Sequence, residues 1–163
     1  MGYPEPMQKF LKLILLAALL LGGSGPARAE SWAIEAGSGF AFVYPHPQLK
    51  LWYRLTEPFE LGLGWSTGIN NYEVWSQNLA LQAKYSLALH PQLRPFATLG
   101  AGLSLFEPGT GWQARPSLGL GLGLDWMFCQ QLGLAGAVQF MLADPYSSAP
   151  FVFRPEINLR YLF

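Results

Sequence analysis

The sequence contains few charged residues. They make up 12% of the 163 residues, against about 25% in a typical soluble protein. The ten basic and ten acidic residues cancel, so the composition lacks the basic excess of a nucleic-acid-binding surface, and no nucleic-acid partner is expected. Apolar residues reach 51%. Low charge and high apolar content together indicate that part of the protein surface contacts something other than water.

Cysteine and histidine are nearly absent. The single cysteine, Cys129, cannot form an internal disulfide, and it is interpreted as a small residue in a turn because no base lies near it in the sequence. His46 and His90 are distant from each other, and with one cysteine they do not match the spacing of a metal site. We therefore expect no metal and no cofactor.

Residues 1–29 have the layout of a secretory signal peptide. Lys9 and Lys12 form a basic start, an apolar run covers 13–23, and small residues end the segment up to Ala29. The apolar run is shorter than the roughly 20 residues that a membrane-spanning helix needs, so cleavage is favoured over an uncleaved anchor. We expect a signal peptide at 1–29 and one exported domain at 30–163.

The exported domain alternates apolar and polar residues in eight segments separated by turn residues. A period of two predicts β-strands, because successive side chains of a strand point to opposite faces. An even number of hairpin-linked strands can close into a barrel that leaves no edge unpaired. The predicted strands are 31–44, 48–56, 59–67, 73–89, 94–106, 117–128, 132–142 and a last strand that starts at Phe151.

The volume of the apolar side chains indicates that they face outward. The apolar register holds more large side chains than the narrow interior of an eight-stranded barrel can contain. The other register is rich in glycine, as at Gly119, Gly121 and Gly123, which suits a crowded interior and would only weaken a strand facing water. Aromatic residues gather at strand ends, as in the interface girdles of membrane barrels. The sequence thus predicts an all-β, eight-stranded antiparallel up-and-down transmembrane β-barrel, in preference to a soluble barrel of the lipocalin type. The expected girdles are Trp32, Phe59, Trp126, Phe128, Tyr161 and Phe163 at one rim and Phe42, Tyr44, Trp65, Trp75, Phe140 and Phe151 at the other.

Three stretches carry a resemblance to a known family. RPFATLGAGLSLF (94–106), SLGLGLGLDWMFCQQLGLAGAVQF (117–140) and the terminal Tyr161 and Phe163 are similar to the small eight-stranded outer-membrane barrels of the OmpA/OmpX type. The resemblance implies a porin-like cell-envelope protein of a Gram-negative bacterium, located in the outer membrane. With the signal peptide removed and an even number of strands, both termini are expected in the periplasm. The expected partners are outer-membrane lipid, including lipopolysaccharide, and the barrel-assembly machinery during insertion, and a monomer is expected.

Six charged residues of the interior register are predicted to form an ion-pair network. They are Glu35, Arg54, Glu60, Lys84, Asp125 and Arg160. A turn near Pro45 would place Glu35 beside Arg54, and the next turn would place Arg54 beside Glu60. The following hairpin would bring Lys84 close to Glu60, barrel closure would set Arg160 near Glu35, and Asp125 lies at a similar depth. An unpaired charge in a narrow lumen is costly, so these groups are expected to pair. The network either closes the lumen to ions or simply fills and satisfies the interior.

A lipid-modifying enzyme is the alternative reading, since the known lipid A palmitoyltransferase and deacylase are also eight-stranded barrels. A small cavity open to the outside is expected among the small residues of the outer lumen. Such chemistry needs a histidine within reach of a serine and an acid. His46 is expected as a solvated turn residue in an outer loop, His90 falls at a periplasmic turn, and the HxS pairing of the deacylase is missing. We assign no catalytic residue and expect a structural or interaction role, ahead of a lipid-binding or lipid A-modifying barrel and then a narrow porin-like channel.

The chain ends in phase with a strand. Ile157, Leu159, Tyr161 and Phe163 alternate with the other register up to the last residue. They are predicted to form the lipid face of a closing strand that pairs with the first strand. Their similarity to the terminal signal read by the barrel-assembly machinery implies a second role in assembly.

Overall fold

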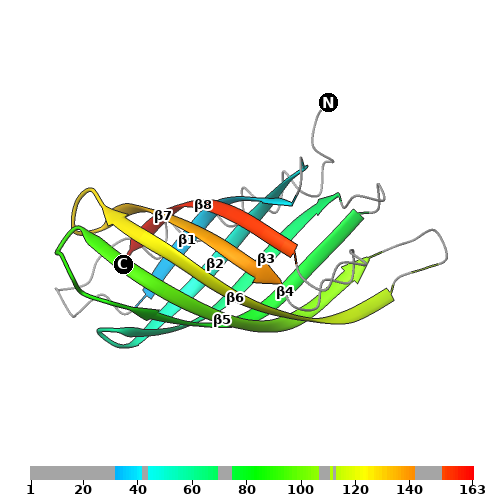
Figure 1. Ribbon diagram of the computed structural model, residues 1–163, viewed down its shortest axis with the longest axis horizontal. Helices are drawn as coiled ribbons and strands as arrows, with labels where there is room; N and C mark the ends of the chain where they lie inside the picture. The colour runs from blue at the N-terminus through cyan, green and yellow to red at the C-terminus, as the bar shows by residue number, and fades with distance from the viewer. Residues whose placement is uncertain (1–31, 42–43, 70–74, 107–110, 112, 142–151) are drawn as a thin grey trace.

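The computed structural model describes residues 32–41, 44–69, 75–106, 111, 113–141 and 152–163. The described residues form eight strands that close into an antiparallel barrel, with each strand paired to its neighbours along the chain (Figure 1). The strands are β1 (Trp32–Ala41), β2 (Tyr44–Thr56), β3 (Phe59–Ile69), β4 (Trp75–Ser86), β5 (Leu93–Phe106), β6 (Gln113–Met127), β7 (Leu132–Met141) and β8 (Val152–Leu162). The predicted barrel is confirmed, whereas the predicted signal peptide lies outside the described residues. Among those residues, no helix is long and apolar enough to cross a membrane.

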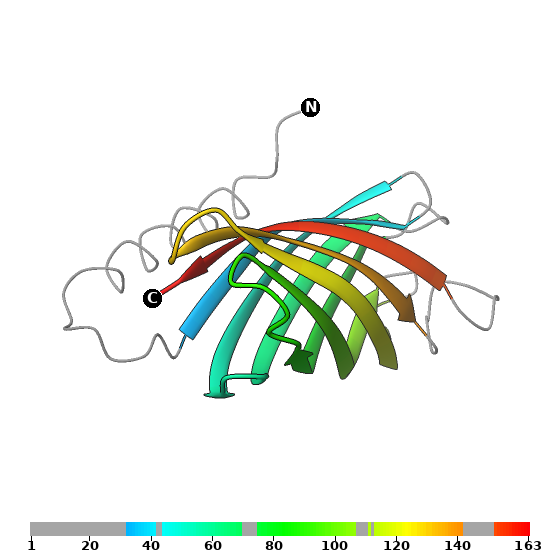
Figure 2. The same ribbon diagram turned by 60° about the vertical axis from the view of Figure 1, so that its left-hand side comes forward.

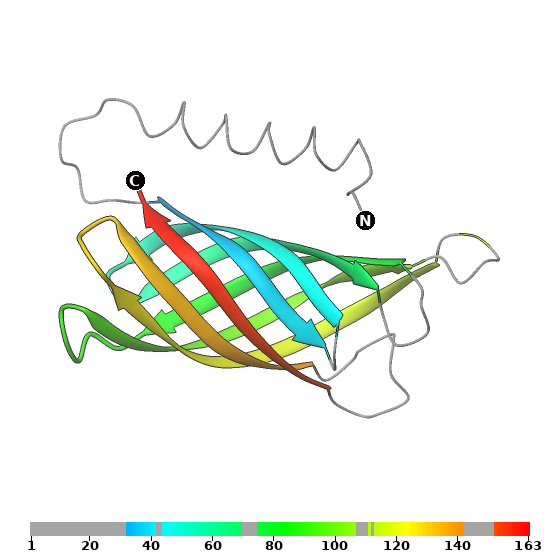
Figure 3. The same cartoon turned by 90° about the horizontal axis from the view of Figure 1, so that it is seen from above.

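Strands β1 and β8 close the barrel. They pair from Ala33 opposite Leu162 to Gly39 opposite Glu156, and Figures 2 and 3 show the red β8 beside the blue β1. The backbone nitrogen of Phe163 donates to the Trp32 carbonyl at 3.0 Å, and the Trp32 nitrogen donates back at 3.3 Å. The ladder therefore continues to the last residue. Closure removes the unpaired edge that an open sheet would expose.

The first hairpin differs from the prediction. The sequence placed a turn at residues 45–47, but β2 already begins at Tyr44, and Ala41 faces Tyr44 across the hairpin. Pro45 and Pro47 pair with β1 only, because the pairing of β2 with β3 starts at Gln48. A proline lacks the N–H that a strand with two neighbours needs, so it is tolerated where one side is unpaired. The two prolines therefore mark a one-sided strand end and not a turn.

The same rule places the other strand prolines. Pro95 of β5 lies just beyond the pairing with β4, which reaches Phe96, and Pro116 of β6 lies beyond the pairing with β7, which starts at Gly119. Pro155 of β8 pairs with β7 but lies just beyond its pairing with β1. Each of these prolines lies near the end of its strand, at a position where the strand on one side no longer pairs with it. The tilt of the barrel thus makes room for residues that a central strand would exclude.

The apolar register faces outward, as predicted. Leu81 is 70% exposed and Leu122 is 62% exposed, whereas the charged Lys84 of the other register is only 1% exposed. This inverts the arrangement of a soluble protein, in which lysine is almost never buried. An outer surface of large apolar side chains around a polar interior is the arrangement of a membrane barrel with a polar lumen.

Aromatic side chains pair at the two rims. The C-terminal rim is defined here as the barrel end that holds the start of β1, the end of β8 and the β2–β3, β4–β5 and β6–β7 connections. The ring pairs there are Trp32 with Tyr53 at 4.8 Å between centroids, Trp126 with Phe128 at 5.0 Å and Tyr161 with Phe163 at 6.2 Å. At the opposite rim Phe140 lies 4.7 Å from Phe153. Such belts suit the membrane–water interface. Of the predicted girdle, Phe42 and Phe151 lie outside the described residues.

Candidate functional site

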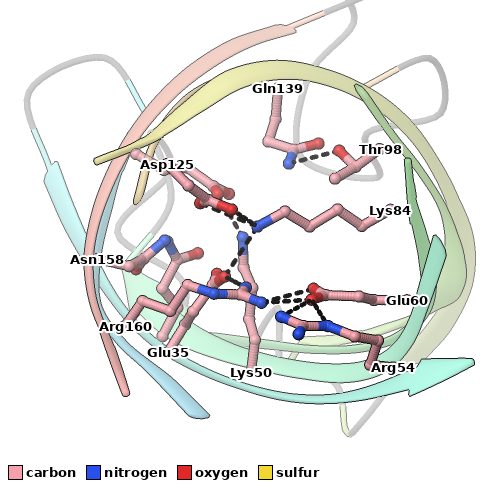
Figure 4. A network of polar contacts seen from close by, with 12 residues as sticks. Glu35, Lys50, Arg54, Glu60, Lys84, Thr98, Asp125, Gln139, Asn158 and Arg160 are labelled. Carbon is pink, nitrogen blue, oxygen red and sulfur yellow. Dashed lines mark hydrogen bonds and ion pairs between the residues drawn. The ribbon is translucent and has the colours of Figure 1, made fainter. Parts of the chain in front are cut away.

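Five charged side chains from five strands meet in the lumen. We call them the lumen charge cluster, and Figure 4 shows them pointing toward one another across the barrel. None is more than 4% exposed. The members are Glu35 of β1, Glu60 of β3, Lys84 of β4, Asp125 of β6 and Arg160 of β8. Their burial places the candidate site inside the barrel.

The cluster is joined by short ion pairs. Lys84 Nζ lies 2.7 Å from Asp125 Oδ2 and 3.2 Å from Glu35 Oε1. Arg160 donates to Glu35 through Nη1 and to both Glu60 oxygens through Nη2, at 2.6 and 2.7 Å. Glu35 therefore links the lysine to the arginine. Charged hydrogen bonds of this length satisfy groups that would otherwise be buried without a partner.

Arg54 completes the charge balance from the C-terminal rim. Its Nε and Nη2 both lie 3.4 Å from Glu60 Oε1, and its side chain is 22% exposed. These contacts are longer than those of Arg160, so they are weaker. With Arg54 included, Glu35, Glu60 and Asp125 face three cations. The six residues selected from the sequence thus come together as one connected set.

One of the predicted pairings requires correction. Glu35 does not lie beside Arg54 but opposite Lys50, because Ala41 pairs with Tyr44 in the first hairpin. Lys84 is the strand neighbour of Glu60, as predicted, but its ion pairs reach across the lumen to Glu35 and Asp125. The predicted neighbours Arg54 and Glu60, and Glu35 and Arg160, are confirmed in the strand register.

A second buried ion pair was missed in the sequence. Lys50 Nζ lies 2.5 Å from Glu156 Oε2, and both side chains are at most 7% exposed. Beside this pair, Gln48 donates to Asn158 Oδ1 at 2.8 Å. Lys50 and Glu156 both occupy the interior register, so the alternation alone contained the signal. The pair was missed because β2 and β8 are not neighbouring strands, so the strand register does not bring Lys50 and Glu156 together.

Aromatic rings hold Lys84 in place. Its ammonium lies 3.9 Å from the ring centre of Phe96 and 5.5 Å from that of Trp52, within the range of cation–π attraction. Glycine makes space for both rings. Gly62 is the strand neighbour of Trp52, and a Cβ there would lie 2.5 Å from the indole; Gly123 is the strand neighbour of Phe96 and has the same role. The interior glycines predicted to fit a crowded lumen therefore do so around this lysine.

An apolar layer separates the lumen charge cluster from the C-terminal rim. It consists of Ala33, Trp52, Met127 and Leu162, each at most 8% exposed. In sequence, Ala33, Met127 and Leu162 each lie two residues closer to the rim than a cluster member on the same strand. The lumen is thus filled by an ionic layer and then by an apolar one.

The other half of the lumen retains a small polar cavity of about 40 Å³. Asn78, Gln82, Thr98 and Gln139 are among its lining residues, and Gln139 donates to Thr98 at 3.2 Å. This volume holds about three water molecules. A small cavity was predicted here from the small residues. Asn78 belonged to the predicted set, and the structure adds the long side chains of Gln82 and Gln139.

The structure contradicts the prediction for His46. It lies in β2 and is 4% exposed, with its ring packed against Gly68, so it is not a solvated loop residue. Its Nε2 has no hydrogen-bond partner among the described residues. His90 is exposed in the β4–β5 connection, and its Nδ1 accepts from the Gln92 nitrogen at 3.2 Å. Within the described part of the chain, no group of three His, Cys, Asp or Glu residues could hold a metal ion.

Solved structures with a similar fold are small outer-membrane barrels. The N-terminal β-barrel domain of Pseudomonas aeruginosa OprF is 20% identical, with a TM-score of 0.66, and the match covers 82% of this chain and 98% of that domain. Neisserial surface protein A is 11% identical with a TM-score of 0.61, over 81% of this chain and 94% of its own. The outer membrane enzyme PagL is 15% identical with a TM-score of 0.51, over 79% and 98%.

No protein-family model matches the chain, and neither does any curated protein sequence. At these identities the structural matches show the fold alone. That fold is the small eight-stranded barrel of outer-membrane proteins. It accommodates an enzyme as well as proteins of other kinds, so function has to be argued from the lumen and the rims.

Proposed function

We propose that this protein is an integral outer-membrane β-barrel whose lumen is closed by its internal ion pairs, and that its role is structural or interactive. The observation that carries the proposal is the lumen charge cluster. Its side chains come from β1, β3, β4, β6 and β8, so they span the cross-section of the barrel (Figure 4). Every member is buried and paired.

Two successive layers oppose the passage of ions. An ion crossing the lumen would have to separate pairs such as Lys84 and Asp125, and breaking a buried pair costs about 3–5 kcal/mol. It would then meet the apolar layer around Trp52 and Leu162, where the side chains of Ala33, Met127 and Leu162 cannot replace its hydration shell.

The outer surface supports residence in a lipid bilayer. Exposed leucines cover the strands between the aromatic pairs of the two rims, which matches the height-limited apolar band of an outer-membrane barrel. In this proposal the band contacts outer-membrane lipid, including lipopolysaccharide, and the C-terminal rim faces the periplasm. The protein acts as a monomer, since closure leaves no strand edge for a second chain.

The C-terminal strand supports a role in assembly. Ile157 and Leu159 point outward at 53% and 51% exposure, and Phe163 is bonded to Trp32 at the seam. The segment therefore offers an apolar face on the strand that completes the barrel. In this proposal Ile157, Leu159, Tyr161 and Phe163 are read by the barrel-assembly machinery before the seam closes.

Location and fold are tested together on outer-membrane fractions. The protein is expressed with its leader, the outer membrane is isolated, and unheated and boiled samples are compared by gel electrophoresis. A compact band that shifts on boiling is expected, because a closed barrel resists detergent until heated. Recovery of the protein in the soluble fraction, or a band that boiling does not shift, would show that the proposal is wrong.

The second candidate function is lipid A modification, favoured by the similarity to PagL. The position of His46 opposes it, since a side chain that is 4% exposed inside the lumen cannot reach lipid outside the barrel. The test is lipid A profiling by mass spectrometry in cells that express the wild type, His46→Ala or the control His90→Ala. A change in lipid A composition that the wild type causes and His46→Ala does not would establish lipid A modification by this protein. Identical lipid A profiles in all strains would exclude this candidate function.

A further inference from the structure

A pocket of about 520 Å³ lies at the C-terminal rim, outside the apolar layer. Its volume is within the range of small-molecule sites, about 300–1,000 Å³. The lining includes Arg54, Gln92, Arg94, Met127, Gln130 and Leu162. It combines two guanidinium groups with an apolar floor, and none of its lining residues is acidic.

Arg94 carries a charge that its surroundings do not neutralise. Its strand neighbour, Asp125, is engaged by Lys84 at 2.7 Å, and the three acids of the lumen charge cluster are matched by Lys84, Arg160 and Arg54. The Arg94 Nε is buried, and within the described residues it has no hydrogen-bond partner. Glu57 lines an adjoining cavity with Arg94, but no ion pair joins the two. A buried donor without an acceptor is energetically costly, so a ligand that accepts a hydrogen bond from this guanidinium would bind favourably.

We propose that this pocket binds a small molecule through a carboxylate or phosphate group, which lies between the guanidinium groups of Arg94 and Arg54. Arginine suits both groups because its planar fork of donors matches their oxygens. The less polar part of the ligand lies against Met127 and Leu162. In the orientation proposed above, the pocket opens to the periplasm.

Cys129 provides the probe. It is the single cysteine of the chain, it is exposed, and it lines the same pocket. The folded full-length barrel is alkylated with iodoacetate, an anion, and with iodoacetamide, its neutral counterpart, and the ratio of the two rates is compared with the ratio in the urea-unfolded chain. In water, one unit charge about 6 Å from a reacting anion changes the local anion concentration about threefold. Since two arginines line this pocket, the ratio is expected to rise at least about threefold on folding. Because any change in thiol reactivity affects both rates, the ratio isolates the charge effect.

Arginine variants and added salt test whether the change in the rate ratio arises from the charges of the pocket. Arg94→Gln is expected to lower the ratio toward the unfolded value, and Arg94→Lys to keep it, since the charge remains. Arg115→Gln, on β6 at the opposite rim, is the matched control and is expected to leave the ratio unchanged. About 1 M NaCl should abolish the excess in the wild type, because the Debye length falls to about 3 Å. The salt experiment needs no variant, so a folding defect of Arg94→Gln would not leave the proposal untested.

Binding is measured as protection. Inorganic phosphate and citrate are each titrated against the alkylation of Cys129 by iodoacetamide, and saturable protection is expected, weakened about tenfold or more by Arg94→Gln. Protection by phosphate alone or by citrate alone identifies the group that the pocket prefers. Equal rate ratios in the folded and unfolded chain, protection by neither anion, or protection that Arg94→Gln leaves unchanged would overturn the proposal.

Discussion

Removal of the charge of Lys84 should strongly destabilise the barrel. Lys84 is 1% exposed and contacts two carboxylates, at 2.7 and 3.2 Å. Lys84→Met keeps a side chain of similar length, so it removes the charge without leaving a large cavity. Glu35 retains Arg160, but Asp125 loses its ion-pair partner. Leaving a buried charge uncompensated costs about 3–5 kcal/mol.

A double-mutant cycle separates the charge effect from packing. Asp125→Asn added to Lys84→Met removes the excess negative charge, so the double variant should be more stable than Lys84→Met alone. The expected coupling between the two sites is about 2 kcal/mol or more, since they are in direct contact. The control Glu57→Gln changes an exposed residue in the β2–β3 turn and should alter the free energy of unfolding by less than about 0.5 kcal/mol.

The assay is urea unfolding of the barrel refolded in lipid vesicles, followed by tryptophan fluorescence, with the free energy of unfolding taken from the linear dependence on urea. A loss below about 1 kcal/mol for Lys84→Met would contradict the account, because a buried, doubly paired cation cannot be removed so easily. Additive effects of the two substitutions would show that Lys84 and Asp125 do not form the pair that the geometry indicates.

Three further predictions concern packing, lipid contact and assembly. Gly62→Ala should cost about 1–3 kcal/mol because its methyl group would meet an indole, whereas Gly136→Ala, whose Cβ would meet nothing, should be nearly neutral in the same unfolding assay. Leu81→Arg at mid-strand should cost about 2–4 kcal/mol if lipid covers it, and Leu89→Arg, equally exposed but in the β4–β5 connection, should cost about 0–1 kcal/mol; equal effects would refute lipid contact. Deletion of Phe163 should reduce the amount of folded barrel in isolated outer membranes, and normal insertion of that truncation would show that the C-terminal signal is wrongly assigned.

The alternation of the sequence was sufficient to predict the strands and the faces, but not every pairing. Placing the first turn near Pro45 moved the turn centre by two residues, and the predicted partner of Glu35 moved from Lys50 to Arg54. Because the predicted register differs from the observed one by an even number of residues, each side chain stays on the same face of the sheet. The inward position of Glu35, Lys50 and Arg54 was therefore predicted correctly. The prolines led to the wrong turn position, because they were interpreted as turn residues. A strand such as β2 accommodates proline only where β3 no longer pairs with it, and that position depends on the closed barrel.

Contacts across the lumen could not be predicted from the strand register, because the register pairs only neighbouring strands. Lys84 of β4 reaches Asp125 of β6 and Glu35 of β1, neither of which is on a neighbouring strand. Their meeting depends on the barrel diameter and on the rings of Trp52 and Phe96 that direct the lysine inward. His46 was misplaced because the first turn was predicted at residues 45–47, whereas the structure makes it a strand residue of β2 that faces the lumen.

Conductance in a planar lipid bilayer tests the closed lumen most directly. The purified wild-type barrel, shown to be folded by its heat-dependent gel shift, is inserted into the bilayer, and single-channel current is recorded in concentrated salt. The account predicts a membrane without large, stable channels, because the lumen charge cluster and the apolar layer both block the path. Large, stable channels from the wild-type protein would contradict it.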